Sequence, residues 1–381
     1  MSAEAESTVP VEDNKRMNLT NAGKTFSRVA RYTVVRAVTI FITVVIALFL
    51  SIMIANMGGY VDEIRRGLIR EDVQQRFITD PSLRRLPSDE KTLRMNEQIL
   101  QEEHRQGLDQ PFIVRALRYM WNAITLDLGY ATNMNSDSGS RNVTTIILER
   151  LPNTLLLWTS SNVLLFFVSV GAALFLSRRY GSFLDKMVVA LSPTSSAPAW
   201  FYGIFLILIF ASVLKVMPFG GMVDTPPPSN PFEYAFSLLK HMILPVLAFS
   251  CSAGIASIYG WRTFFLIYSS EDYVEMAKAK GLSSRNIERR YILRPTLPNI
   301  ITNFALLLVF SWSGATVFET VFNWPGLGLM FYRAITLVET SVIIGQTVIY
   351  SYLLGITVFL LEFIYVLVDP RVKIGGREGS V

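Results

Sequence analysis

Six long apolar runs dominate this chain, and most of its charged residues lie between them. Each run reaches or approaches the roughly 20 residues that a helix needs to cross a bilayer core. The uncharged stretches are 37–55, 151–177, 187–214, 242–261, 295–318 and 340–361. Pro193 and Pro198 interrupt the third run, which a bundled membrane helix tolerates where its neighbours satisfy the freed carbonyls. The pattern predicts an all-α membrane protein with six transmembrane helices.

The same pattern divides the chain into a tail, a first helix, an outer segment, a helical core and a second tail. These parts are expected at 1–31, 32–55, 56–143, 144–369 and 370–381. The spans of the core are expected at about 152–177, 187–214, 242–264, 297–318 and 342–366. Residues 1–27 are polar and poor in aromatics, which is typical of a disordered tail.

The distribution of Lys and Arg orients the helices. Both tails are basic, and so are the second-to-third and fourth-to-fifth connections. Because cytoplasmic loops carry such an excess, both tails and both connections are predicted to be cytoplasmic. The arginines in the long outer segment do not argue against this, because long loops escape the rule. The net charge of +5 therefore reflects topology, and no nucleic-acid partner is expected.

The outer segment 56–143 is predicted to contain two helices. An amphipathic one is indicated by Ile64, Leu68, Val73 and Phe77. A second, very polar one is expected over 89–105. The Ser/Asn/Gly stretch from Asn133 to Asn142 then predicts a flexible link to the bundle.

Motifs for catalysis or metal binding are absent from the sequence. Gly23-Lys24-Thr25 resembles the end of a phosphate-binding loop, but Asn18 stands where that loop needs its first glycine. His104 and His241 lie in separate connections, with no cysteine or carboxylate cluster beside them. The only cysteine, Cys251, excludes an internal disulfide. We expect no catalytic residue, no metal site and no enzymatic activity in this chain.

Residues 273–298 are predicted to form a basic helix pair between two spans. Ser269 and Asp272 are expected to form a capping box for the first helix, and Gly281 suits a left-handed stop. Ser283 or Ser284 is expected to cap a second helix, which Pro295 ends. Ala277 and Gly281 lie four residues apart on one face, where another backbone has room to approach. Such an element either docks a cytosolic partner or lies on anionic lipid.

Two further features carry alternative interpretations. Glu362 lies seven residues before Asp369 inside the last apolar region, which indicates either a functional acid or a structural ion pair. The turn that contains Trp324, Pro325, Gly326 and Gly328 is expected at the outer surface. The rigidity of this turn favours a role as a gate, whereas its tryptophan favours a role as an anchor at the membrane interface.

In these motifs the chain resembles the inner-membrane permease subunits of binding-protein-dependent ABC importers of the dipeptide, oligopeptide and nickel type. The similarity covers about 107–372. Its cytoplasmic motif appears as Glu275, Met276, Ala277 and Gly281, followed by Leu293-Arg294. The other matching segments are 107–111 (GLDQP), 127–130 (DLGY), 149–154 (ERLPNT), 319–328 (ETVFNWPGLG) and 369–371 (DPR).

The resemblance implies a type I ABC importer permease fold in the cytoplasmic (inner) membrane of a bacterium or archaeon. It implies a second permease subunit, two cytosolic ATPase subunits that bind ATP and Mg, and an extracytoplasmic solute-binding protein. The residues implied to couple to the ATPases are Tyr273, Val274, Glu275, Ala277, Lys278, Ala279, Gly281, Leu282, Ser283 and Leu293.

The solute is implied only as a class, namely peptides, with oligosaccharides or nickel complexes as alternatives. Met57 to Tyr60 replace the Pro-Gly-Asp-Pro usual in the family, which leaves the outer contact surface and the solute open. An ion-coupled transporter is the rival from another class, but it would need several intramembrane ionisable groups, and Glu362 stands alone. A membrane scaffold or sensor would need a recognisable output domain.

Overall fold

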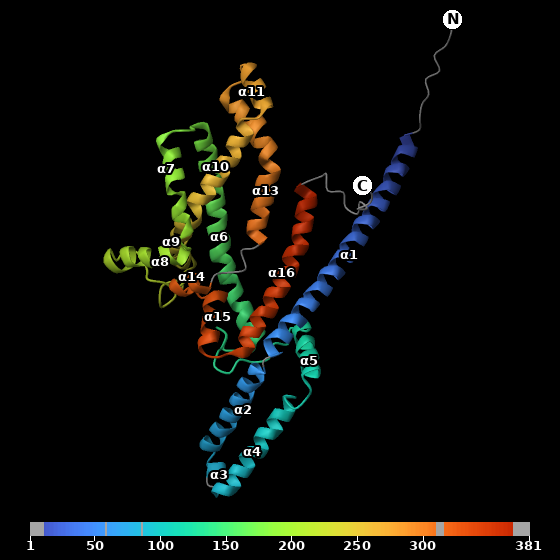
Figure 1. Cartoon of the computed structure of the whole chain (residues 1–381), viewed down its shortest axis with the longest axis vertical. Helices are drawn as coiled ribbons and strands as arrows, with labels where there is room; N and C mark the ends of the chain where they lie inside the picture. Colours follow the sequence, from blue (N-terminus) through green and yellow to red (C-terminus); the bar gives the residue numbers. More distant parts are fainter. Residues whose placement is uncertain (1–10, 58, 85–86, 310–315, 369–381) are drawn as a thin grey trace.

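The computed structural model describes residues 11–57, 59–84, 87–309 and 316–368, with side chains described from Arg31 to Leu361 except at a few positions. Helices make up the regular structure of these residues, and a single isolated bridge pairs Tyr130 with Asn142. In Figure 1 the helices form an elongated bundle, with α11 (Asp272–Ala279) at one end and α2 to α4 at the other. The predicted all-α class is confirmed.

Four helices in the described residues are long and apolar enough to cross a membrane, and a bent pair makes up to five. They are Arg31–Ile54 in α1 (Val11–Met57), Val143–Arg178 (α6), Pro231–Ser269 (α9 to α10) and Thr340–Leu361 in α16 (Thr340–Val368). The expected span 297–318 begins in α13 (Arg294–Val309), but 310–315 lie outside the described residues. Four to five spans therefore follow from the structure, and six stay a prediction.

The N-terminal region differs from the expectation of a disordered tail. Helix α1 begins at Val11 and continues without a break to Met57. Helix propagation adds one hydrogen bond for each residue fixed, and 11–31 contain no proline to stop it. Residues 1–10 and the C-terminal tail 369–381 lie outside the described part.

The third apolar run is not one straight helix. Its two halves, Phe183–Ser196 and Ala199–Val213, meet at an angle of 98°. They comprise α7 (Phe183–Leu191), η1 (Ser192–Ser196), α8 (Ala199–Leu206) and η2 (Ile207–Val213). Ala197, which precedes Pro198, is extended with φ −79° and ψ 134°, as the proline ring favours. The two prolines therefore end the first half instead of being absorbed in a continuous span.

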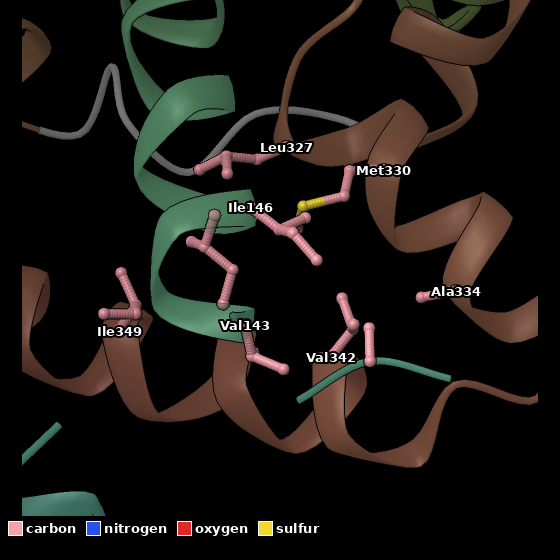
Figure 2. Packing of buried hydrophobic residues seen from close by; sticks show 9 residues of the cluster. Val143, Ile146, Leu327, Met330, Ala334, Val342 and Ile349 are labelled. Carbon is pink, nitrogen blue, oxygen red and sulfur yellow. The ribbon is translucent and has the colours of Figure 1, made fainter. Parts of the chain in front are cut away.

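A buried apolar cluster joins the outer ends of three helices (Figure 2). Val143 and Ile146 of α6 pack there against Leu327 and Met330 of α15 (Leu327–Thr336) and against residues of α16, among them Val342. At Gly345 of α16 an added Cβ would lie 2.6 Å from Val143 Cγ1, so only a glycine permits this approach. This cluster fixes the turn that carries Trp324 against the start of α6.

The outer segment forms a helical hairpin beyond the bundle (Figure 1). Its helices are α2 (Tyr60–Thr79), α3 (Pro81–Arg84), α4 (Ser88–Arg105) and α5 (Phe112–Ile124), so both predicted helices are confirmed. Val73, Phe77 and Leu108 are buried between them. Asp62 and Arg115 add an ion pair of 2.8 Å at the base, with both side chains at least 86% covered.

The stretch Asn133–Asn142 is not a flexible link. Ser136 is 7% exposed, and its backbone N–H donates to Ser140 O at 2.8 Å. Glu149 of α6 accepts from the Asp137 N–H and from the Ser138 hydroxyl, both at 2.7 Å. The serines and asparagines therefore serve as turn-forming hydrogen-bond partners, a role that composition alone does not distinguish from flexibility.

Candidate functional site

The predicted helix pair lies at the end of the molecule opposite α2 to α4, at the tip of α10 (Ile255–Ser269) (Figure 1). Its first helix, α11, ends as expected at Gly281, which has φ +74°. The Gly281 N–H donates to Lys278 O at 2.9 Å and the Leu282 N–H to Ala277 O at 3.3 Å, the paired bonds of a Schellman stop. This turn lets the chain reverse within three residues.

The predicted capping box is wrong. The N-cap residue of α11 is Glu271, without a side-chain cap bond, and the Ser269 hydroxyl donates backwards to Leu266 O. Helix α10 extends through Ser269, so this hydroxyl is used within α10 before α11 begins. Ser283, in contrast, occupies the predicted N-cap position of α12 (Ser284–Ile287), although its side chain makes no cap bond.

Pro295 does not end the second helix. Helix α12 continues through the π-helical η4 (Glu288–Leu293) into α13, so helical backbone runs past the proline. The π turn changes the hydrogen-bond register just before Pro295, where the missing N–H would otherwise break the ladder. The Thr296 hydroxyl also donates to Ile292 O and Leu293 O at 2.9 Å, which satisfies carbonyls in that turn.

The two faces of α11 have different surroundings. Val274 and Ala277 are buried, at 0% and 2% exposure, in a cluster with Ala173, Phe265 and Ile287. The expectation that Ala277 stays open to another backbone is therefore wrong, because this small side chain instead brings α11 close to the chain's own core. The exposed implied coupling residues are Tyr273, Glu275, Lys278, Ala279, Gly281, Leu282 and Ser283, and Leu293 is half-buried.

We call the exposed residues of 271–285 the coupling surface. Cations at its C-terminal part include Lys278, Lys280 and Arg285, and acids at its N-terminal part include Asp272 and Glu275. Gly281 has open space around the position of an added Cβ. The coupling surface is thus charged, exposed and shaped by a glycine turn, as a docking surface requires.

Two ion pairs join the helices next to the coupling surface. Arg262 of α10 makes a bidentate contact with Asp185 of α7, with one bond of 2.7 Å from Nη2, and both residues are at least 93% buried. Arg178, at the end of α6, contacts Glu288 of η4 at 3.0 Å. The apolar cluster around Val274 packs α11 against α6 and α10, while the two ion pairs join α10 to α7 and α6 to η4.

The outer turn is built into the core. Trp324 is 0% exposed and its indole N–H donates to Asn153 O at 2.9 Å, while the Asn153 amide donates to Pro325 O at 2.9 Å. A fully buried tryptophan cannot contact lipid headgroups, so the interpretation of Trp324 as an interfacial anchor is wrong. At Gly326 an added Cβ would lie 2.4 Å from both Glu319 and Thr154 oxygens, which excludes any larger residue.

The centre of this turn is Glu319, a residue whose role the sequence did not reveal. Its carboxylate, 0% exposed, accepts from Thr154 at 3.1 Å, from the Trp158 indole at 3.2 Å and from the Gly328 N–H at 2.7 Å. It lies at the N-terminal end of α15, where a negative charge is favourable. The two matching segments 149–154 and 319–328 supply most of these groups, and their joint presence was the available signal.

Glu362 lies within α16, but its side chain is outside the described residues, so both interpretations of it stay open. Among the described residues, then, the predicted sites form two separate groups. The coupling surface lies at one end of the bundle, and the residues of the outer turn lie at the other (Figure 1).

Comparison with known proteins agrees with the motif pattern. Residues 167–374 match the family described as binding-protein-dependent transport system inner membrane component. The oligopeptide transport system permease protein AppB of Bacillus subtilis is 31% identical over 295 residues, 75% of this chain and 90% of that protein. The probable D,D-dipeptide transport system permease protein DdpB of Escherichia coli is 29% identical over 293 residues, 71% and 83% of the two chains.

Among solved structures, a chain from the inward-facing MetNI methionine ABC transporter matches with a TM-score of 0.41 and 15% identity, covering 61% of this chain and 96% of that chain. The family match spans more than half of the sequence and includes the whole coupling surface. The chain belongs to the family of binding-protein-dependent transport system inner membrane components.

Proposed function

We propose that this chain is the permease subunit of an ATP-driven importer and forms half of a pathway for peptides or a related small solute. The observation that carries the proposal is the coupling surface, which is exposed on one face of α11, whereas Val274 and Ala277 on the other face pack against residues of α6, α10 and α12. A surface of this kind transmits the movement of a bound partner to the membrane helices. A helix that merely lay on lipid would not need such attachment.

The partner that suits the coupling surface is a pair of cytosolic ATPase subunits. Exposed Lys278, Lys280 and Arg285 complement an acidic groove, and the glycine turn at Gly281 lets a partner backbone come close. ATP and Mg belong to those partners, and this chain contributes no catalytic group. ATP binding and hydrolysis move the coupling surface, and the attached helices α6, α7 and α10 follow.

The outer end of the molecule suits the delivery of solute. The hairpin of α2 to α4 projects beyond the bundle, opposite the coupling surface (Figure 1), and we assign it to contact with a solute-binding protein. A second permease subunit completes the pathway, and the complex resides in the cytoplasmic membrane of a bacterium or archaeon. The names of the two relatives support peptides as the solute, with oligosaccharides and nickel complexes as alternatives within the same architecture.

The test is purification of the chain from its own cells through a C-terminal tag. Two ATPase subunits and a second permease should co-purify, and the complex in nanodiscs should hydrolyse ATP faster when the solute-loaded binding protein is added. A matched preparation with Lys278, Lys280 and Arg285 changed to Glu should lose the ATPase subunits while it still inserts in the membrane. A wild-type complex that contains no ATPase subunit would contradict the proposal.

A further inference from the structure

The bend of one membrane helix meets a π turn in another. Helix α7 passes into η1 before Pro198, and α9 (Pro231–Phe249) passes into the π-helical η3 (Ser250–Gly254). The Ser252 hydroxyl donates to Ala197 O at 2.8 Å, and the Ala256 N–H donates to Ser195 Oγ at 3.2 Å. Irregular backbone at membrane depth is tolerated only where protein covers it or where it lines a water-filled cavity.

The depth of this junction follows from the ion pair between Asp185 and Arg262. The pair lies next to the basic turn at Arg179, near the cytoplasmic boundary of the membrane. Ser195 comes ten residues after Asp185, and Ser252 comes ten residues before Arg262. Both distances are about 15 Å at 1.5 Å per residue, which is half of the roughly 30 Å hydrocarbon core. The junction therefore lies near the middle of the membrane.

The junction presents hydroxyl groups at the surface of the chain. We define the hydroxyl patch as Thr194, Ser195 and Ser196 of η1 with Ser250 and Ser252 of η3. Thr194 and Ser196 are exposed and the other three are half-buried. The hydroxyls of Thr194, Ser250 and Ser252 donate to backbone carbonyls of the chain. Ser195 Oγ accepts from the Ala256 N–H, and the Ser196 hydroxyl has no hydrogen-bond partner within the described residues. The hydroxyl hydrogens of Ser195 and Ser196 are thus left at a depth where lipid offers no acceptor.

The membrane-facing part of α1 provides the contrast. Its exposed side chains include Val38, Phe41, Ile42 and Ile46, all apolar and suited to lipid. A surface that met lipid at the level of the hydroxyl patch would need the same composition, because exposed hydroxyls lose their hydrogen bonds to water in hydrocarbon. The patch therefore belongs to a surface that meets water or solute.

We infer that the hydroxyl patch lines the translocation pathway near the middle of the membrane and binds uncharged hydrogen-bonding groups, such as the main-chain amides of a peptide. This inference rests on the proposed transport function and adds the place and chemistry of solute contact. The patch contains no ionisable side chain, so it recognises features common to many solutes and does not select for side-chain charge. A bent helix near the midplane suits this role, because the Ser195 and Ser196 hydroxyls at the bend are available as donors to a ligand.

The natural sequence supplies a useful background for the test, because Cys251 is its only cysteine and is exposed in η3. The complete complex is reconstituted in proteoliposomes, and a membrane-impermeant methanethiosulfonate reagent is added during ATP hydrolysis, so that all conformations are visited. Ser196→Cys is made in a Cys251→Ser background. Val168→Cys in the same background is the control, since Val168 is 54% exposed on α6 and lies ten residues before Arg178, at the same depth.

The Ser196→Cys complex should react about tenfold faster or more than the Val168→Cys complex, because thiols react as thiolates, which need water. N-acetyl-trialanine amide at millimolar concentration should slow this reaction, because it offers amides without charge. Equal labelling of the two variants in a complex that hydrolyses ATP would overturn the pathway assignment and place the patch against the second permease. Fast labelling without protection would overturn the amide chemistry. A complex without ATPase activity would instead count against the proposed function.

Discussion

The two ends of the bundle are built in opposite ways. At the outer end, Trp324 and Glu319 are fully buried, and the donors around the Glu319 carboxylate come from α6 and α15 of the same chain. At the opposite end, α11 buries only Val274 and Ala277 and leaves the coupling surface exposed. The polar groups of the outer turn are satisfied within this chain, whereas the proposed function has a partner cover the coupling surface. Stability should therefore respond to changes of buried groups, and function to changes of the exposed coupling surface.

The largest effect on stability is expected at the buried ion pair between Arg262 and Asp185. Arg262→Ala leaves the Asp185 carboxylate buried without its cation, which costs about 3–5 kcal/mol. The free energy of unfolding of the chain in detergent micelles measures this loss. The exchange of both residues, Asp185→Arg with Arg262→Asp, should recover part of it. If Arg262→Ala were as stable as the wild type, the attachment of α10 to α7 would not depend on this pair.

A smaller loss is expected at the outer turn. Glu319→Gln places an amide N–H₂ among groups that all donate, so at least one buried donor loses its acceptor at a cost of about 1–3 kcal/mol. Unfolding in the same micelles is the measurement, and Glu233→Gln, at an exposed position of α9, is the matched control with no change. Equal stability of the two variants would mean that the outer turn is not held by Glu319.

A change in the coupling surface should alter stability little and function strongly. Gly281→Leu forces a side chain into a left-handed conformation at a cost of about 1 kcal/mol. The added side chain meets open space in this chain but would obstruct a partner, so stimulation of ATP hydrolysis by the loaded binding protein should be lost. Gly139→Leu is the control for strain, because Gly139 also has a positive φ and open space but lies in the outer segment. Full stimulation of ATP hydrolysis in the Gly281→Leu complex would contradict the assignment of this surface to coupling.

The smallest effect should come from the second ion pair. Arg178 has a side chain that is 51% exposed, so its contact with Glu288 is screened by water and is worth about 0–1 kcal/mol. Arg178→Ala should leave the free energy of unfolding nearly unchanged, in contrast to Arg262→Ala. A loss as large as that of Arg262→Ala would show that both pairs, and not one, hold the coupling surface to the membrane helices.

The sequence by itself determined the features that depend on composition and local geometry. Apolar runs long enough to cross a bilayer determined the all-α membrane class, because backbone groups in lipid must be satisfied within a helix. The apolar spacing from Ile64 to Phe77 predicted α2, and Gly281 predicted the stop of α11, because only a residue without a side chain adopts that φ at little cost. Linear motifs were sufficient to indicate the family.

Only the tertiary structure decided how these elements meet. Prolines have opposite effects at two places in the chain. The helix continues past Pro295, because a π turn and a neighbouring hydroxyl satisfy the backbone there. The chain bends by 98° before Ala199, where a hydroxyl of η3 donates to the backbone at the bend. In the sequence, Glu319 is indistinguishable from an ordinary acid near the end of a span. In the structure, α6 and α15 place hydrogen-bond donors around its carboxylate. Ala277 pointed inward because α10 and η4 pack against it. Each outcome depends on groups distant in sequence, and local propensity carries no information about them.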